Sequence, residues 1–169
     1  MQDEPTPIEL TRAVADFLRN EIALACDLII ASENATFALP EPRVGLAALA
    51  GGLQRLPRQI GLKRAMGMIL TARHVSAKEG LELGFVNEVV PTGEALAAAE
   101  RWAETIARNS PMSIRASKQA IRMGMEVSLE KAMTEQREYP AVKAMAASQD
   151  YIEGPKAFAE KRPPKWLGR

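Results

Sequence analysis

The stretch EIALACDLIIASENATFALPEP, residues 21–42, decides the fold of the first half of this chain. Its alanine-rich start is compatible with a helix, but the apolar run at residues 28–30 is rich in β-branched side chains, which favours a buried strand. The polar break at residues 32–34 predicts a turn, and ATFALPE predicts a second strand. We therefore expect two short buried strands joined by a turn.

Two glutamates, Glu21 and Glu41, border this unit. A strand pair joined by a turn returns the chain to near its starting point, so we expect the two side chains to converge. Pro40 and Pro42 flank Glu41 and predict a backbone held rigidly at a strand end. Two carboxylates at the rim of an apolar layer perturb each other's pKa and divide acid and base roles. On the residues alone, the alternative of two exposed solubilising side chains stays open.

The segments after this unit read as short helices and one further strand. VGLAALAGGLQRLPRQIG and LKRAMGMILTARH are helical in composition but are interrupted by the pair Gly51-Gly52, by Pro57 and by Gly61. We interpret these glycines, and Gly45, as turn residues. FVNEVVP predicts a strand that Pro91 ends.

Local signals also mark the start and the end of one short helix. Ser76 followed by Glu79 is a capping-box pattern, and Gly84 supplies the stop.

From Glu94 onward the pattern is helical throughout. Pro111 and Pro140 are expected to end or break helices, and a last helix is expected at about residues 149–162. The apolar residues of this region are spread over several faces, which predicts packing against another subunit; lining of the chain's own core is the alternative. These residues are Trp102, Met112, Met123, Met125, Met133 and Met145.

The composition argues against several classes of partner. Lys and Arg total 22 and Asp and Glu total 21, so the net charge of +1 gives no field that would gather nucleic acid or an anionic membrane. No window approaches ~20 consecutive apolar residues, so no membrane span is expected. The single cysteine, Cys26, lies in an apolar run, which predicts a buried thiol and a reducing, cytoplasmic location. The only histidine, His74, is interpreted as a surface turn residue.

Several separate blocks, in this order, resemble the enoyl-CoA hydratase/isomerase family, also called the crotonase family. They are Glu21 with the stretch that follows it to VGL, then GGLQRLPRQIG, ILTARHVSAKEGLELGFVNEVVP and EGPKAFAEKRPPKWLGR. The resemblance runs from about residue 21 to the C-terminus. FALPE and EGPKAFAEKR, with the closing W-x-G-R, look most like the carnitinyl-CoA dehydratase branch.

The resemblance implies a fold of the α/β class. Residues 21–91 would form part of a crotonase-like superhelix of β-β-α turns, and residues 92–169 an all-helical oligomerisation region that builds trimers or dimers of trimers. Residues 1–20 do not resemble the family and are expected to form a separate, helical N-terminal segment.

The resemblance also implies a lyase chemistry on acyl-CoA thioesters. In hydratases of this family, glutamates at the positions of Glu21 and Glu41 face one water molecule that adds across the α,β double bond. Coenzyme A is then part of the substrate, and no further cofactor and no metal is expected. Phe158 and Lys161 match positions near the adenine and phosphate end of CoA, although a solvated helix-end lysine is an alternative for Lys161.

The chain departs from the family pattern just before Glu21. Relatives carry a run of glycines there, whereas this chain has Leu18, Arg19 and Asn20, and the backbone N–H of Leu18 is the one candidate oxyanion donor. The upstream segment that supplies the second donor is not recognisable. Because loss of one such donor costs about 10²–10³ in rate, a second hypothesis stays open: a truncated, non-catalytic remnant that serves as an assembly or acyl-CoA-binding module.

Overall fold

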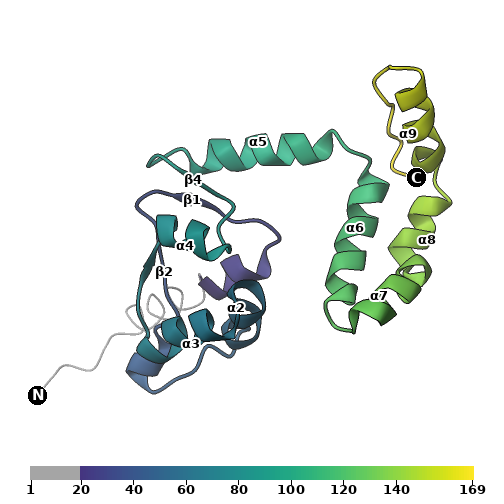
Figure 1. Ribbon diagram of the computed structural model, residues 1–169. Helices are drawn as coiled ribbons and strands as arrows, with labels where there is room; N and C mark the ends of the chain where they lie inside the picture. The colour runs from purple at the N-terminus through teal and green to yellow at the C-terminus, as the bar shows by residue number, and fades with distance from the viewer. Residues whose placement is uncertain (1–19) are drawn as a thin grey trace, which may run out of the picture. The chain divides into compact units, whose positions relative to one another are not determined.

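The protein forms two compact units in this computed structural model, which describes residues 20–169. The units divide after Ala99, inside helix α5 (Ala95–Ala107), as the colours of Figure 1 allow the reader to follow. The expected N-terminal segment lies, apart from Asn20, outside the described residues. Each unit is therefore considered by itself.

The first unit contains two small two-stranded sheets. Strand β1 (Ile30–Ser32) pairs in parallel with β4 (Glu88–Val90), and β2 (Thr36–Phe37) pairs antiparallel with β3 (Val75–Ser76). The turn predicted between β1 and β2 is present, since the Ala35 N–H donates to the Ser32 carbonyl at 2.8 Å. The predicted strand before Pro91 is also confirmed as β4.

The expectation that the first two strands pair with each other is wrong. The hydrogen bonds of the turn explain this. They extend the pairing of β1 with β4 on one side of the turn and the pairing of β2 with β3 on the other. The Glu33 N–H donates to the Val90 carbonyl at 2.8 Å, beyond the end of β1, while the Ala77 N–H donates to the Ala35 carbonyl at 3.0 Å, next to β2. The turn therefore carries the chain from one small sheet to the other.

Three helices cover the core of this unit: α2 (Gly52–Ile60), α3 (Leu62–Thr71) and α4 (Ala77–Leu83). Its largest fully buried side chains are Leu39, Leu56, Met68 and Val75. The rings of Phe37 and Phe85 meet edge to face, with 5.2 Å between centroids and 86° between planes, which is a favoured aromatic geometry. Burial of such side chains is the main source of stability here.

The local helix signals are mostly confirmed, with one exception. The Ser76 hydroxyl accepts from the Glu79 N–H at 3.1 Å to cap α4, and Gly84 ends that helix in the left-handed conformation. Gly61 separates α2 from α3, as expected. Pro57, however, lies inside α2 rather than ending it. Burial of Leu56 and Ile60 on the same helix offsets the one backbone hydrogen bond that proline removes.

The second unit is helical, as the pattern after Glu94 predicts. Serine side chains at positions 110, 128 and 148 cap its helices by accepting a backbone N–H three residues ahead. Pro111 and Pro140 each begin a new helix at a position where the missing N–H costs nothing. Helix α6 packs against α8. The helices after α5 are α6 (Pro111–Gly124), α7 (Leu129–Glu135), α8 (Pro140–Ala146) and α9 (Gln149–Ala159), with a 3-10 turn η2 (Gln136–Glu138) before α8.

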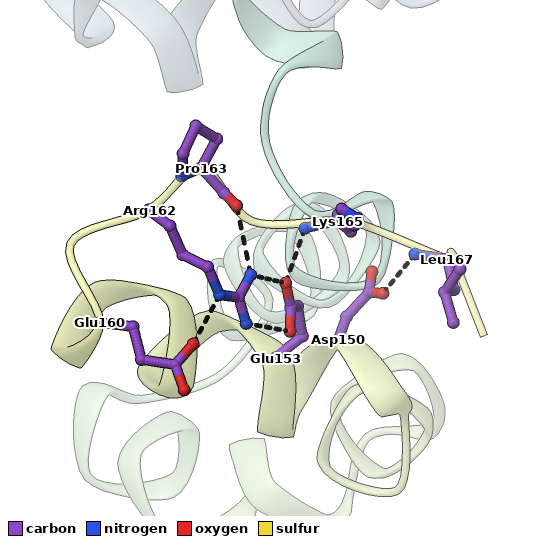
Figure 2. A network of polar contacts seen from close by, with 7 residues as sticks. All are labelled: Asp150, Glu153, Glu160, Arg162, Pro163, Lys165 and Leu167. Atoms are coloured by element: carbon purple, nitrogen blue, oxygen red, sulfur yellow. Dashed lines mark hydrogen bonds and ion pairs between the residues drawn. The ribbon is translucent and has the colours of Figure 1, made fainter.

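The C-terminal tail is fastened to α9 through Asp150, which is buried. Its carboxylate accepts from the Leu167 N–H at 2.7 Å, from the Gly168 N–H at 3.2 Å and from the Ser110 hydroxyl at 2.7 Å. Burial on its own would raise the pKa of Asp150, but these three donors outweigh it, so the pKa lies below its usual value. The tail thus packs on the unit through backbone donors, and Figure 2 shows the Asp150–Leu167 contact beside a second one made by Glu153.

The apolar residues of the helical unit divide between inside and outside. Trp102, Met112 and Met145 are half-buried, whereas Met125 and Met133 are exposed by 65% and 62%. The half-buried residues contribute to the unit's own core, and packing of the exposed ones against another subunit stays a prediction.

Two smaller expectations concern single residues of the first unit. Cys26 is exposed, so the prediction of a buried thiol is wrong; it follows the helical residues 20–25 and its thiol donates to the Ile22 carbonyl at 3.4 Å. His74 is exposed in a loop, as expected. Across residues 20–169, no helix combines the length and the apolar character needed to span a membrane.

Candidate active site

Glu21 lies in the helical segment of residues 20–25 and is almost completely buried. One of its carboxylate oxygens, Oε1, accepts the Gly52 backbone N–H at 2.8 Å. Next to it, the Asn20 side chain donates to the Ala38 carbonyl at 2.6 Å and so ties this helical segment to the chain just before Pro40. Glu21 is therefore held in place by two elements that lie far from it in sequence.

Gly52 is a site residue that the sequence pattern did not indicate, because the glycine pair was interpreted as turn chemistry alone. It is the first residue of α2, so its N–H is one of the unpaired donors at a helix start, where the helix dipole favours negative charge. A Cβ at this position would lie 2.9 Å from Leu39 Cδ2 and 3.0 Å from Glu21 Oε1. The sequence offered one signal for this role. A tight turn requires only one glycine, and the chain has two in a row, Gly51 and Gly52.

Glu41 begins the 3-10 helix η1 (Glu41–Val44) and does not end a strand, which corrects the sequence prediction. Pro40 precedes it with ψ of 3°, so the extended conformation has already stopped. Pro42 is accommodated as the second residue of η1, where its missing N–H has no helical partner to lose. The two prolines do stiffen the backbone around Glu41, but in a tight turn.

The Glu41 carboxylate is buried without a hydrogen-bond partner. The residue is 4% exposed, and neither Oε1 nor Oε2 has a partner among the described residues. A buried carboxylate normally has several donors, and leaving such a group unpaired is costly. An unpaired polar group that persists in a folded protein is a hallmark of functional sites, where it is kept for a ligand or for catalysis.

The electrostatics of the two glutamates differ. Burial raises the pKa of the Glu41 carboxyl; its own backbone N–H lowers it by less, and the nearby negative charge of Glu21 raises it further. The two side chains therefore interact, as expected, although the route is a helix and a 3-10 turn rather than a strand pair. Glu21 accepts an N–H at a helix start, and Glu41, whose pKa is raised, is suited to carry a proton.

The remaining predicted site residues are Leu18, Phe158 and Lys161. Leu18 lies outside the described residues, so its proposed role as an oxyanion donor stays a prediction. Phe158 and Lys161 belong to the second unit, and both are exposed, Phe158 by 87%. Within the described part of the chain, no three His, Cys, Asp or Glu side chains are grouped in a way that would hold a metal ion.

The fold and site thus describe an α/β protein with a buried pair of carboxylates in unlike surroundings. Residues 20–169 match the family model described as enoyl-CoA hydratase/isomerase. The chain therefore belongs to the enoyl-CoA hydratase/isomerase family, which confirms the resemblance found in the sequence.

Similar proteins of known name or structure agree with this assignment. The chain is 39% identical to 2,3-dehydroadipyl-CoA hydratase of Escherichia coli and 40% identical to carnitinyl-CoA dehydratase of Proteus mirabilis, each over 88% of this chain and 58% of the relative. A crystal structure of enoyl-CoA hydratase from Mycobacterium tuberculosis superposes with a TM-score of 0.83 at 39% identity, covering 88% of this chain and 58% of that one. The expected α/β crotonase-type fold, partial in extent, is confirmed, and the chain spans 58% of the length of these relatives.

Proposed function

We propose that this chain carries the acid–base machinery of an enoyl-CoA hydratase or dehydratase, which adds or removes water across the α,β bond of an acyl-CoA thioester. The observation that carries the proposal is the pair of buried glutamates in unlike surroundings. Glu21 has a backbone donor at the start of α2, and Glu41 has none and an elevated pKa. Hydration needs one group that accepts a proton and one that delivers a proton, held a short distance apart.

In the proposed reaction the two carboxyl groups act on opposite ends of the double bond. Glu21, ionised, takes a proton from a water molecule while the water oxygen forms a bond to the β-carbon. Glu41, protonated, gives its proton to the α-carbon, so that the electron pair of the double bond ends in the new C–H bond. The two carboxyls then exchange a proton with solvent to restore their starting states. Dehydration is the same path reversed.

The family supports acyl-CoA thioesters as the substrate class, while the acyl group stays unassigned. Two relatives are named for reactions of carnitinyl-CoA and 2,3-dehydroadipyl-CoA, whose acyl groups differ in charge. We propose that Phe158 and Lys161 contact the adenine and phosphate end of CoA. We also propose that CoA takes part only as a portion of the substrate, and that no cofactor is needed. A cytoplasmic location remains part of the proposal.

A hydration assay in deuterated water tests the proposed reaction. The purified chain is incubated with crotonyl-CoA, and the product is analysed by mass spectrometry and NMR. We expect 3-hydroxybutyryl-CoA with one solvent deuterium on the α-carbon. With Glu21→Gln we expect a rate about 10²–10⁴ lower, because the base is lost. Equal rates for the wild-type chain and the Glu21→Gln variant would overturn the proposal.

We further propose that the active form is a homo-oligomer, a trimer or a dimer of trimers. Support comes from large apolar side chains that the helical unit leaves exposed: Ile121 by 67%, Met125 by 65%, Leu129 by 78% and Met133 by 62%. Monomeric proteins rarely expose so many such residues in one region. Light scattering of the wild-type chain should give a mass of three or six chains, and Leu129→Lys should lower it. A wild-type monomer at micromolar concentration contradicts this part.

A further inference from the structure

Lys161 adopts a backbone conformation that normally belongs to glycine. Its φ is +54°, in the left-handed region, whereas six of the eight described residues with positive φ are glycines. The other exception is Ala72, whose side chain is 2% exposed, so that packing accounts for its methyl group. Lys161 is exposed, and packing gives no such account.

The hydrogen bonds around Lys161 form a helix-ending motif in which glycine is strongly preferred. The Lys161 N–H donates to the Phe158 carbonyl at 3.2 Å, and the Arg162 N–H donates to the Ala157 carbonyl at 3.1 Å. This is the Schellman pattern, with Lys161 at its left-handed position. At the end of α4 the same chain places Gly84 in that conformation. A lysine here therefore carries a cost that a glycine would avoid.

Arg162, the residue after Lys161, forms an ionic fork with Glu153 and Glu160, which Figure 2 shows. The Arg162 guanidinium donates to both Glu153 oxygens, at 2.6 and 3.0 Å, and through Nε to Glu160 at 2.6 Å. Glu153 also accepts the Lys165 N–H at 2.8 Å. Arg162 and that N–H lower the pKa of Glu153 to about 2, so Glu153 stays charged across the physiological range. The residue after Lys161 is thus fixed on α9 by charge-assisted bonds.

What this rigid turn presents to solvent is an aromatic ring and a cation. Phe158 is the most exposed large apolar side chain in the described part of the protein, at 87%. Lys161 lies three residues further on and is exposed as well. An exposed ring and an exposed ammonium group on one helix end suit a ligand that has a flat base and a phosphate.

We propose that the Glu153–Arg162–Glu160 fork is a positioning device that holds Lys161 in its left-handed conformation, so that the Lys161 ammonium and the Phe158 ring meet the nucleotide end of CoA together. This inference rests on the proposed function and deepens it by assigning positioning roles to residues that touch neither the thioester nor the two catalytic carboxyls. On this proposal, the chain keeps a lysine at a position that favours glycine because the lysine ammonium group binds CoA.

The decisive test is Lys161→Gly, because the inference predicts opposite changes in stability and in binding. Glycine relieves the backbone strain, so the Tm should rise by about 2–4 °C. Loss of the ammonium group should weaken CoA binding, measured by calorimetry, about tenfold or more. In the hydration assay KM should rise with kcat nearly unchanged, since the contact is equal in ground and transition states. A variant that binds CoA as tightly as wild type, or one that loses stability, overturns the inference.

Matched variants separate positioning from general damage. Lys161→Arg keeps the charge and should bind CoA within about threefold of wild type. Arg162→Lys keeps the charge but loses the bidentate fork, so it should weaken CoA binding and leave kcat unchanged. If Arg162→Lys lowers the Tm without changing CoA affinity, the fork is structural only and the inference fails.

Failure of the inference about the fork and failure of the proposed hydration reaction would give different results. A chain that shows no hydration but a Lys161-dependent affinity for CoA keeps the inference and loses the proposed reaction. If the chain hydrates crotonyl-CoA and Lys161→Gly leaves the KM unchanged, the proposed reaction stands and the inference about the fork fails. Absence of CoA binding by the wild-type chain overturns the inference directly.

Discussion

Glu41→Gln should abolish hydration and at the same time make the protein more stable at neutral pH. The carboxyl is 4% exposed, has no hydrogen-bond partner among the described residues and lies near the negative charge of Glu21. As the proposed acid it supplies the α-proton, and its loss should lower kcat by about 10²–10⁴. Because the folded state disfavours ionisation of this carboxyl, wild-type stability is reduced above pH 4.5, so a neutral amide should raise the free energy of unfolding by about 1 kcal/mol.

The stability difference should depend on pH in one direction. The pKa of Glu41 is raised in the folded state above its ordinary value of 4.5. Below pH 4.5 the carboxyl is protonated in both states and the wild-type chain and the variant should be nearly equal. As pH rises through the folded pKa, the unfolded state has already released its proton while the folded state still holds it, so wild-type stability falls. The advantage of Glu41→Gln therefore opens above pH 4.5, grows with rising pH and levels off once the pH exceeds the folded-state pKa.

Urea unfolding of the two proteins between pH 4 and pH 8, followed by circular dichroism, measures this difference. Glu33→Gln is a suitable control, because Glu33 is exposed and its carboxylate already accepts the Thr92 N–H at 3.2 Å. That variant should show no gain in stability as pH rises. An advantage of Glu41→Gln that shrinks with rising pH would contradict the assigned environment of Glu41.

Gly52→Ala should lower both stability and activity. A Cβ at residue 52 would meet Leu39 Cδ2 at 2.9 Å, Ala48 Cβ at 3.0 Å and Glu21 Oε1 at 3.0 Å. All three neighbours are buried, so relief requires movement of the core or of the Glu21 carboxylate. We expect a loss of about 1–3 kcal/mol in the free energy of unfolding from overpacking. Displacement of Glu21 should cost about 10² in kcat.

Gly67→Ala is the matched control for that substitution. Gly67 lies in the middle of α3, and a Cβ there would have no atom within 4 Å. Alanine should therefore stabilise the helix by about 0.5–1 kcal/mol and leave activity unchanged. Urea unfolding and the hydration assay on both variants make the comparison. If Gly52→Ala behaves like Gly67→Ala, the role of Gly52 in holding Glu21 is wrong.

Local chemistry was well predicted from sequence where a few neighbouring residues decide it. Ser76 and Gly84 bound α4 as expected, and Pro111 and Pro140 each begin a helix. The turn after Ser32 is also where the polar break placed it. In each case the donor and the acceptor lie within a few residues, so the pattern contains the whole interaction.

The wrong strand pairing and the wrong burial of Cys26 depend on the packing of segments that are distant in sequence. Strands β1 and β2 looked like a pair because they are adjacent. In the structure β1 pairs with β4, whose residues lie 58 positions further along, and β2 pairs with β3, whose residues lie 38 to 40 positions further along. Cys26 looked buried because its neighbours are apolar, yet it is exposed. Whether a short apolar strand pairs with its neighbour or with a remote segment depends on the packing of the whole unit, which local pattern does not report.

The sequence by itself determined the family of this protein, its α/β start and helical end, and the identity of the two glutamates. Only the tertiary structure decided how these glutamates differ. Glu21 receives an N–H from Gly52, which is 31 residues away, and Glu41 receives no hydrogen bond from any other described residue. Residue type sets which group can ionise, but burial and the donors within reach set its pKa, and both depend on where the folded chain places distant atoms.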